Sequence, residues 1–298
     1  MHIFDSYVTG DCFAVTAVMA THNYTNSASN ASALVLNAGL DVDCGDLLNN
    51  YTLEAVNGIS QKRYCSHLEF AEIYVAEKLV TMDTVDQALI NQFLVKLRLG
   101  LFDPVDSQKY MQYSPDVINS DEHKALALRA VRESVVLLKN DNGLLPIAPS
   151  KNMAVLGPNC LATDALLGNY FGSPEHIVSI CEGVKAYKSE TKCFKGCDIN
   201  STVTDGFKTA CLMAKVATNT ILVMGLDTTV EQEGNDRDYL VLPGNQNDFI
   251  EAMAECSPTP IVLVMVNGGP VDISAAVANP KVGAILYAGN PMISQNSI

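Results

Sequence analysis

Positive charge is scarce in this sequence. It has 19 Lys and Arg residues against 33 Asp and Glu residues in a length of 298, and its formal net charge is −14. So acidic a chain repels phosphate backbones and anionic lipid, which argues against nucleic acid and membrane as partners. Charged residues make up only 17% and apolar residues 48%, which is typical of a globular protein and not of a disordered one. The length suggests about two domains.

Several patterns that would assign a function are also missing. The sequence has no G-x-G-x-x-G after its apolar runs, no G-x-x-x-x-G-K-[ST] and no G-x-S-x-G, so dinucleotide, P-loop and serine hydrolase sites are not indicated. No C-x₂-C pair and no histidine pair at ligand spacing occurs, and we expect neither a metal nor a cofactor. The longest apolar runs, such as Pro260 to Val266, fall far short of the roughly 18 residues of a membrane helix.

Cysteines and glycosylation motifs suit a protein of the secretory pathway. The nine cysteines are scattered, and an odd number leaves at least one thiol unpaired if the others form disulfides. Asn-x-Ser/Thr sequons occur at Asn23, Asn30, Asn50 and Asn200. The N-terminus carries neither a basic stretch nor an apolar run, so we expect no signal peptide in this chain.

The second half of the chain alternates apolar runs with helical patterns. Continuous apolar runs separated by helices predict a doubly wound α/β domain with a parallel sheet. We expect helices over Asp205 to Thr218 and Asn245 to Glu255, and one long helix over Asp121 to Lys139 leading into this domain. The expected strands are Met153 to Leu156, Thr220 to Gly225, Ile261 to Val266 and Val282 to Ala288.

The first hundred residues have a different pattern. Short strands are expected at Ser6 to Thr9 and at Leu40 to Asp43, with a helix over Asn30 to Asn37 between them and strong helical character over residues 71–100. Two strand and helix units cannot close a barrel or form a stable sheet alone, so this region resembles a piece of something larger. Asp103 to Asn119, rich in Pro, Asp, Tyr and Ser, is expected to be a linker.

Two acidic features are candidates for chemistry. Asp11 directly follows an expected strand, and catalytic side chains collect at the carboxyl ends of strands in α/β folds. Three acids and one arginine lie within Val230 to Arg237 after another strand. Carboxylates that lie close together raise one another's pKa, which a general acid working near neutral pH requires. The alternatives are a turn or helix-capping role for Asp11 and a solvated acidic loop with an arginine salt bridge.

Many strings of the sequence resemble plant β-D-xylosidases of glycoside hydrolase family 3, and they occur in the same order. The strings are YVTGDC (7–12), NAGLDVDCG (37–45), LRLGLFDP (97–104), ESVVLLKNDNGLLPI (133–147), AVLGPN (154–159), LLGNYFG (166–172), VMGLDTTVEQEGNDR (223–237), LPGNQNDFI (242–250) and VNGGPVDIS (266–274).

The resemblance implies a secreted enzyme of wall polysaccharides that releases xylose from β-xylosides, with arabinofuranosides as further substrates. It implies an active site between an N-terminal (β/α)₈ barrel and a C-terminal α/β sandwich. Residues 1–102 would be the end of the barrel, 103–120 a linker and 121–298 an incomplete sandwich domain. In this family the nucleophile corresponds to Asp11, where Gly10 replaces a serine. The acid/base would be Glu233, with Glu231 as the second choice.

A retaining mechanism needs one ionised and one protonated carboxyl group about 5–5.5 Å apart. Acids as distant in sequence as Asp11 and Glu233 would meet only across a domain interface. Three departures from the family predict impaired activity: the chain begins at the nucleophile strand, Ile59 to Val75 has no recognisable counterpart, and the similarity stops near Gly289. The alternative is a non-catalytic remnant that binds carbohydrate or a partner through the sandwich domain.

Overall fold

The computed structural model describes residues 6–45, 80–148, 152–172, 174 and 176–291. The chain divides into two compact units, residues 1–114 and 115–298. Ile59 to Val75, Asn50 and Cys65 lie outside the described residues. The finer domain limits drawn from the sequence, 1–102, 103–120 and 121–298, stay predictions.

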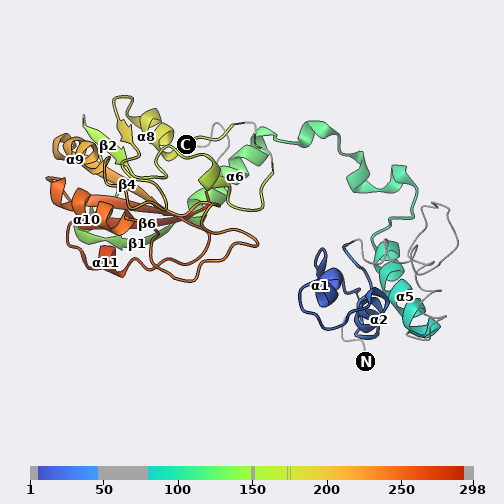
Figure 1. The fold of residues 1–298 in the computed structure, drawn as a ribbon. Helices are drawn as coiled ribbons and strands as arrows, with labels where there is room; N and C mark the ends of the chain where they lie inside the picture. Colours follow the sequence, from blue (N-terminus) through green and yellow to red (C-terminus); the bar gives the residue numbers. More distant parts are fainter. Residues whose placement is uncertain (1–5, 46–79, 149–151, 173, 175, 292–298) are drawn as a thin grey trace. The chain divides into compact units, whose positions relative to one another are not determined.

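The second unit is built on a twisted sheet (Figure 1). Within the described residues this sheet has six strands, in the order β1-β6-β5-β4-β2-β3. Neighbouring strands are parallel except β1 and β6, which are antiparallel. This mostly parallel sheet confirms the predicted α/β fold, and β2, β4, β5 and β6 coincide with the four predicted strands. The strands are β1 Val136–Asn140, β2 Met153–Leu156, β3 Lys192–Phe194, β4 Asn219–Gly225, β5 Ile261–Val266 and β6 Val282–Gly289.

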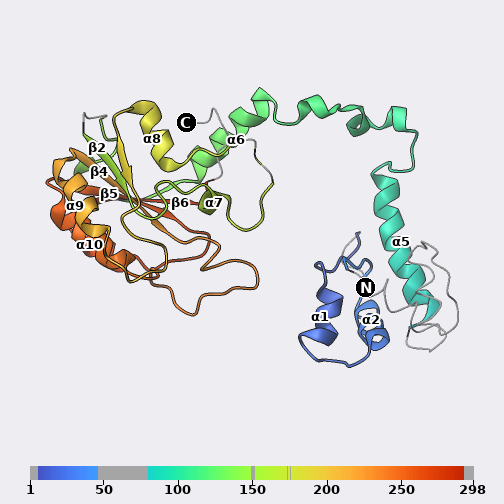
Figure 2. The same cartoon turned by 45° about the horizontal axis from the view of Figure 1, so that its top comes forward.

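Both faces of the central strands are buried, because alternate side chains point to opposite layers. Leu222 and Met224 of β4 pack with side chains of α9, α10 and α11, whereas Ile221 and Val223 pack with side chains of α7 and α8. Figure 2 shows α8 on one side of the sheet and α9 and α10 on the other. These helices are α7 Asp164–Leu167, α8 Ile180–Tyr187, α9 Phe207–Val216, α10 Gln246–Cys256 and α11 Ser274–Ala278.

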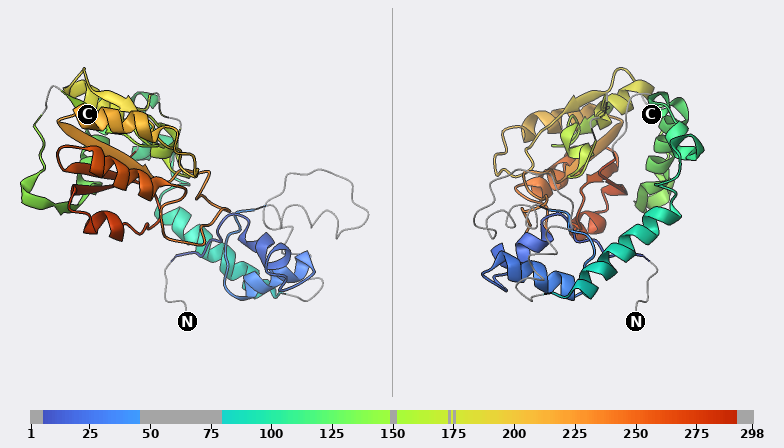
Figure 3. Two further views of the ribbon diagram at one scale, coloured as in Figure 1. Left: turned by 60° about the vertical axis from the view of Figure 1, so that its left-hand side comes forward. Right: turned by 90° about the vertical axis from the view of Figure 1, so that its right-hand side faces the viewer.

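Helices α9 and α10, which the sequence predicts, form a tightly packed pair. The rings of Phe207 and Phe249 meet edge to face with their centroids 5.0 Å apart, and Ala210 of α9 is fully buried. A disulfide between Cys211 and Cys256 joins the two helices, with 5.4 Å between the Cα atoms. Helix α11 lies beside α10 on the same face (orange and red in Figure 3).

The single helix predicted over Asp121 to Lys139 is wrong in its last part. Helix α6 covers Asp121–Ser134, with the Ser120 hydroxyl accepting the His123 N–H, and β1 begins at Val136. The residues that follow α6 include an apolar run that is compatible with a helix or with a strand, but their backbone groups pair with β6. That pairing joins segments far apart in sequence, and local periodicity does not report it.

Strand β3 is not predicted from the sequence, because it has only three residues. Its position is set by parallel pairing with β2 and by a disulfide between Cys193 and Cys181 of α8. Helix α8 begins with a capping box, in which Ser179 and Glu182 exchange hydrogen bonds. The Ser179 N–H and hydroxyl lower the pKa of the Glu182 carboxyl group.

The first unit contains three described α-helices, α1 Ala14–Ala20, α2 Ala28–Asn37 and α5 Met82–Arg98. The strands predicted at Ser6 to Thr9 and Leu40 to Asp43 are shorter than expected, because within the described residues they form one parallel bridge, Thr9 to Val42. A disulfide joins Cys12 and Cys44 just beyond this bridge.

The stretch predicted as a linker contains three short 3₁₀ helices. None of them has a buried residue, so the stretch has no core of its own. They are η1 Val105–Ser107, η2 Lys109–Gln112 and η3 Pro115–Val117.

Replacing Cys211 or Cys256 with Ala is expected to lower the free energy of unfolding by about 2–4 kcal/mol, because their disulfide closes a large loop in the unfolded chain. Either single change removes the bond, so the two single variants and the double variant are expected to lose similar amounts. Denaturant unfolding followed by circular dichroism measures the loss. If the single losses add up in the double variant, the two side chains contribute separately and the expectation fails.

Candidate active site

A pocket of about 230 Å³ opens at the carboxyl edge of the sheet in the second unit. The segments after β2 and β4 contribute most of its lining, and Gly268 and Asn290 come from the ends of β5 and β6. Strand β2 has β4 on one side and β3 on the other. The connection after β2 runs to β3, whereas the connection after β4 runs the opposite way to β5. The carboxyl ends of β2 and β4 therefore form a switch point, where ligands of open α/β sheets bind.

The loop after β4 starts from a fixed point. Gly225 has a φ of 137°, and a Cβ atom there would meet the carbonyl group of Val266 in β5. The fully buried Gln246 accepts the Gly225 N–H at 2.9 Å and donates to the Gly225 carbonyl at 2.9 Å. The Leu226 N–H donates to the Val266 carbonyl at 2.9 Å. The end of β4 is thus held by one side chain and by the neighbouring strand.

Glu233 lies at the tip of a tight turn in this loop. Gln232 and Asn235 exchange two backbone hydrogen bonds of 3.1 and 2.9 Å, and Gly234 between them has a φ of 77°, which glycine adopts without a Cβ clash. The Glu233 side chain is exposed and lines the pocket. Within the part of the chain that the structure describes, no hydrogen bond or ion pair engages its carboxylate. Glu233 is free to meet a ligand.

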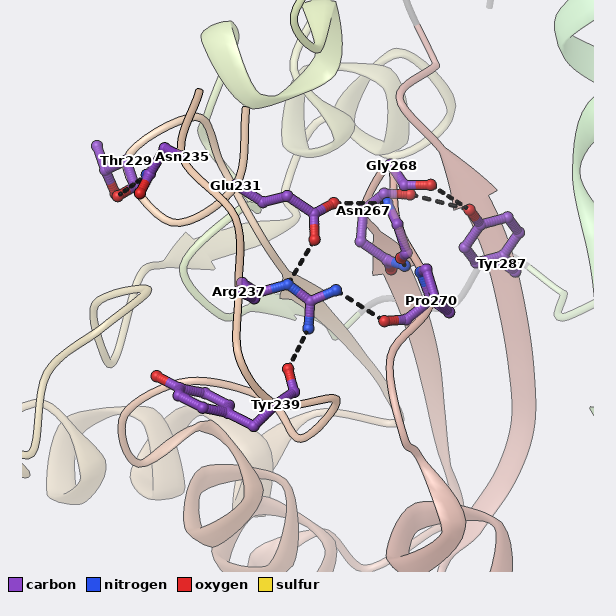
Figure 4. Close-up of polar contacts among 10 residues, drawn as sticks. Thr229, Glu231, Asn235, Arg237, Tyr239, Asn267, Gly268, Pro270 and Tyr287 are labelled. Atoms are coloured by element: carbon purple, nitrogen blue, oxygen red, sulfur yellow. Dashed lines mark hydrogen bonds and ion pairs between the residues drawn. The ribbon is translucent and has the colours of Figure 1, made fainter. Parts of the chain in front are cut away.

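Glu231, two residues earlier, has partners on both carboxylate oxygens (Figure 4). Its Oε2 accepts from Arg237 Nε at 2.6 Å and its Oε1 from the Gly269 N–H at 2.9 Å. The side chain of Glu231 is 26% exposed and that of Arg237 only 5%. The arginine salt bridge expected as the alternative for this acidic loop is therefore present, and it involves Glu231.

The loop after β5, which supplies the Gly269 N–H, is also held by β6. The Tyr287 hydroxyl of β6 donates to the Asn267 carbonyl at 3.0 Å (Figure 4). Asn267 is 2% exposed, and its Nδ2 donates to the Gly269 carbonyl at 2.7 Å. The donor that binds Glu231 is therefore presented by a braced loop.

Asp11 belongs to the first unit and follows its single described bridge. Gly10 N–H donates to the Val42 carbonyl at 2.9 Å, and Asp11 Oδ1 accepts the N–H of Cys12 at 2.8 Å. The Asp11 side chain is exposed. The disulfide of Cys12 fixes the chain on the far side of Asp11 to Cys44, so this carboxylate projects from a short segment that is tied at both ends.

The second segment of that bridge is anchored to α5. Asp41 accepts the Val8 N–H at 2.7 Å and the Asn91 Nδ2 at 2.9 Å. The buried Gln92 donates to the Asp41 carbonyl at 2.6 Å. These bonds hold the bridge against α5 in the absence of a wider sheet among the described residues of this unit.

Two cysteines are unpaired within the described part of the chain, and they do not supply a nucleophile. Cys160 and Cys197 are both buried. Desolvation raises the pKa of Cys160 to about 11 and that of Cys197 to about 12. Both thiols are therefore protonated near neutral pH, and the thiolate is the reactive form of cysteine.

Comparison with known proteins decides the family. Residues 135–296 match the Glycosyl hydrolase family 3 C-terminal domain. The chain belongs to glycosyl hydrolase family 3. The match contains every strand of the sheet and both loops that hold Glu231, so the pocket lies within the family 3 C-terminal domain.

Similar proteins of family 3 are named as xylosidases. The chain is 39% identical over 292 residues to "Probable beta-D-xylosidase 7" of Arabidopsis thaliana, with coverage of 97% of this chain and 36% of that protein. "Beta-D-xylosidase 1" of the same plant is 35% identical over 290 residues, with coverage of 96% and 35%. The chain therefore spans about a third of the length of the curated relatives it matches.

A solved structure of family 3 agrees with the fold. The exo-β-xylosidase XlnD, in complex with a xylobiose aziridine activity-based probe, is 32% identical with a TM-score of 0.80. The alignment covers 97% of this chain and 35% of that one. The sheet described above is thus that of a family 3 C-terminal α/β sandwich.

Several residues that shape this family 3 pocket carry no signal in the sequence. Gln246 and Tyr287 form hydrogen bonds with backbone groups that lie beside them only in the folded chain. The Gly268 and Gly269 pair, one residue after the apolar run that ends at Val266, is a visible hint of a close backbone approach. Among the described residues no cluster of histidine, cysteine and acidic side chains is suited to hold a metal ion, and no described helix has the length and apolar character to cross a membrane.

Gly225→Ala is expected to destabilise the second unit by at least about 3 kcal/mol, because its Cβ would overlap the Val266 carbonyl at the base of the pocket loop. Gly289→Ala is the matched control. Gly289 also has a positive φ, 66°, but has open space around its missing side chain, so only backbone strain of about 1–2 kcal/mol is expected. Denaturant unfolding compares the two variants, and equal losses would show that the close contact with Val266 does not matter.

Proposed function

We propose that this protein is a retaining exo-acting hydrolase of β-xylosides, with xylan-derived oligosaccharides as substrates and arabinofuranosides as further candidates. The observation that carries the proposal is the free carboxylate of Glu233 in a pocket at the switch point of a family 3 domain. Relatives along almost the whole chain are named β-xylosidases, which supports xylosides as the substrate class.

In this proposal Asp11 is the nucleophile and Glu233 the acid/base. The Asp11 carboxylate attacks the anomeric carbon, the bond from that carbon to the leaving oxygen breaks, and the leaving oxygen takes the Glu233 proton. Glu233 then accepts a proton from water, whose oxygen attacks the same carbon and releases Asp11. Two inversions retain the configuration, and the reaction needs only carboxyl groups and water.

Of the two glutamates, Glu233 fits the acid/base role better than Glu231. Both oxygens of Glu231 accept hydrogen bonds, from Arg237 and from Gly269, so a proton transfer through Glu231 would have to break one of them. Glu233 is exposed in the pocket without such partners among the described residues. We keep Glu231 as the second candidate for the acid/base role.

We propose that Asp11 belongs to the end of a (β/α)₈ barrel, as the family resemblance implies. The described residues of the first unit form one parallel bridge and no closed barrel, so slow turnover is expected from this chain alone. The second candidate function follows from the same observation: a non-catalytic remnant that binds carbohydrate or a partner through the sandwich domain.

Leaving-group dependence tests the two carboxyl roles. Glu233→Gln is expected to lower turnover of an aryl β-xyloside with a poor leaving group by about 10²–10⁴-fold, and to lower it much less with an activated leaving group that needs no proton. Asp11→Ala is expected to abolish both reactions, because no glycosyl-enzyme forms. Glu255→Gln, an exposed acid of α10, is the control.

Steady-state rates with the two substrates measure these effects. Turnover that survives in Asp11→Ala would contradict the nucleophile assignment. No turnover by the unmodified chain, together with calorimetric binding of xylobiose, would support the non-catalytic function in its place.

We also propose an extracellular or cell-wall location. Three disulfides join described cysteines, namely Cys12 with Cys44, Cys181 with Cys193, and Cys211 with Cys256. Such bonds form and persist in oxidising compartments and are rare in the cytosol.

N-glycans are expected at Asn23 and Asn200 of protein produced through a eukaryotic secretory pathway, because both side chains are exposed outside helices and strands. Lower occupancy is expected at Asn30. Its sequon lies within α2, where Ser32 is fully buried and its hydroxyl donates to the Ala28 carbonyl. Peptide mapping after enzymatic deglycosylation measures each site, and full occupancy at Asn30 with none at Asn200 would contradict the expectation.

A further inference from the structure

We propose that Glu231 is a positioning residue, and that with Arg237 it fastens the turn carrying Glu233 to the loop after β5. The role in catalysis rests on the proposed function of Glu233, whereas the mechanical connection between the loops does not. The geometry points to one ion pair that joins the segment 231–239 to the segment 267–270.

Arg237 connects one side chain and two backbone carbonyls. Its Nε donates to Glu231 Oε2 at 2.6 Å, its Nη1 to the Tyr239 carbonyl at 2.9 Å and its Nη2 to the Pro270 carbonyl at 2.8 Å (Figure 4). The guanidinium is planar and rigid, so these three bonds also fix its orientation. At 5% exposure, the side chain is screened from water far more than an ordinary surface arginine.

Glu231 completes the connection from the other side. Its Oε1 accepts the Gly269 N–H at 2.9 Å, so the carboxylate binds the same loop that Arg237 reaches at Pro270. A Cβ atom on Gly269 would meet the Glu231 carboxylate, at 2.9 Å from Cδ. The carboxylate therefore fits closely against the loop, and only glycine permits this approach.

The position of Glu231 is passed on to Glu233 through one short turn. Only Gln232 lies between them, and Gln232 is paired with Asn235 by two backbone hydrogen bonds. The Asn235 side chain adds a bond to the Thr229 carbonyl at 3.3 Å. Because the turn is closed in this way, a shift of the Glu231 backbone moves the Glu233 carboxylate as well.

The connection predicts a pattern of amide exchange that spans both loops. In the full chain, Arg237→Lys and Gly269→Ala are each expected to speed hydrogen exchange about tenfold or more in peptides covering 228–240 and 267–271, since bonds to a partly buried charge are lost. Lysine keeps the charge but cannot make three bonds in fixed directions. Exchange in β4 reports whether the fold is intact.

Two neighbouring variants serve as controls for exchange. Gly268→Ala places a Cβ at 3.6 Å from Asn290 Oδ1, an ordinary contact, and Glu233→Gln removes a carboxylate without described partners. We expect neither variant to speed hydrogen exchange in the peptides 228–240 and 267–271 together. The proposal is overturned if Arg237→Lys or Gly269→Ala affects one loop only, or neither, while the fold remains intact.

The pH dependence of turnover separates a positioning role from an acid role. The alkaline limb of the profile belongs to the group that must be protonated. Glu231→Gln is expected to lower kcat and keep this limb, whereas Glu233→Gln is expected to remove it. Loss of the limb in Glu231→Gln alone would make Glu231 the acid. If the unmodified chain shows no turnover but the coupled exchange is observed, the connection stands and the proposed function fails.

Discussion

Strands β4 and β5 are buried on both faces, and this constraint determines the layout of the second unit. Leu222 and Val223 of β4 and Leu263 of β5 are fully buried, which requires a layer of helices on each side of the sheet. Such layers come from crossover connections, and these make neighbouring strands parallel. Parallel strands end at one edge. The loops after β2, β4, β5 and β6 therefore meet there, and the pocket with Glu233 follows from the burial of the core.

At that edge the ladder of backbone hydrogen bonds stops, and side chains supply the missing partners. Gln246, fully buried, binds both backbone groups of Gly225 and the Ile199 carbonyl. A buried polar group without a partner costs about 1–3 kcal/mol, so this one amide stabilises three groups. Arg237 also donates to the carbonyls of Tyr239 and Pro270, which belong to exposed residues. The base of the pocket is thus fastened, and the Glu233 carboxylate is left for a ligand.

Local pattern was sufficient where an element depends on its own residues. The continuous apolar runs at Ile261–Val266 and Met153–Leu156 predicted β5 and β2 to the residue. Local pattern failed where a strand depends on a partner far away in sequence. The end of a predicted helix forms β1, because its backbone groups pair with β6. Strand β3 was not predicted, because it has only three residues and its position depends on pairing with β2. Pairing of the cysteines was open for the same reason, since disulfide geometry depends on the distance between Cα atoms in the fold.

The α/β class of the second unit, the family resemblance and the acidic candidates can all be read from the sequence, because apolar periodicity and residue type are local properties. The sequence did not separate Glu231 from Glu233, which have identical chemistry and lie two positions apart. Only the tertiary structure decided which of them is bound. The strand order places β5 beside β4, and this brings the Gly269 N–H and the guanidinium of Arg237 to Glu231 while Glu233 stays at the tip of its turn.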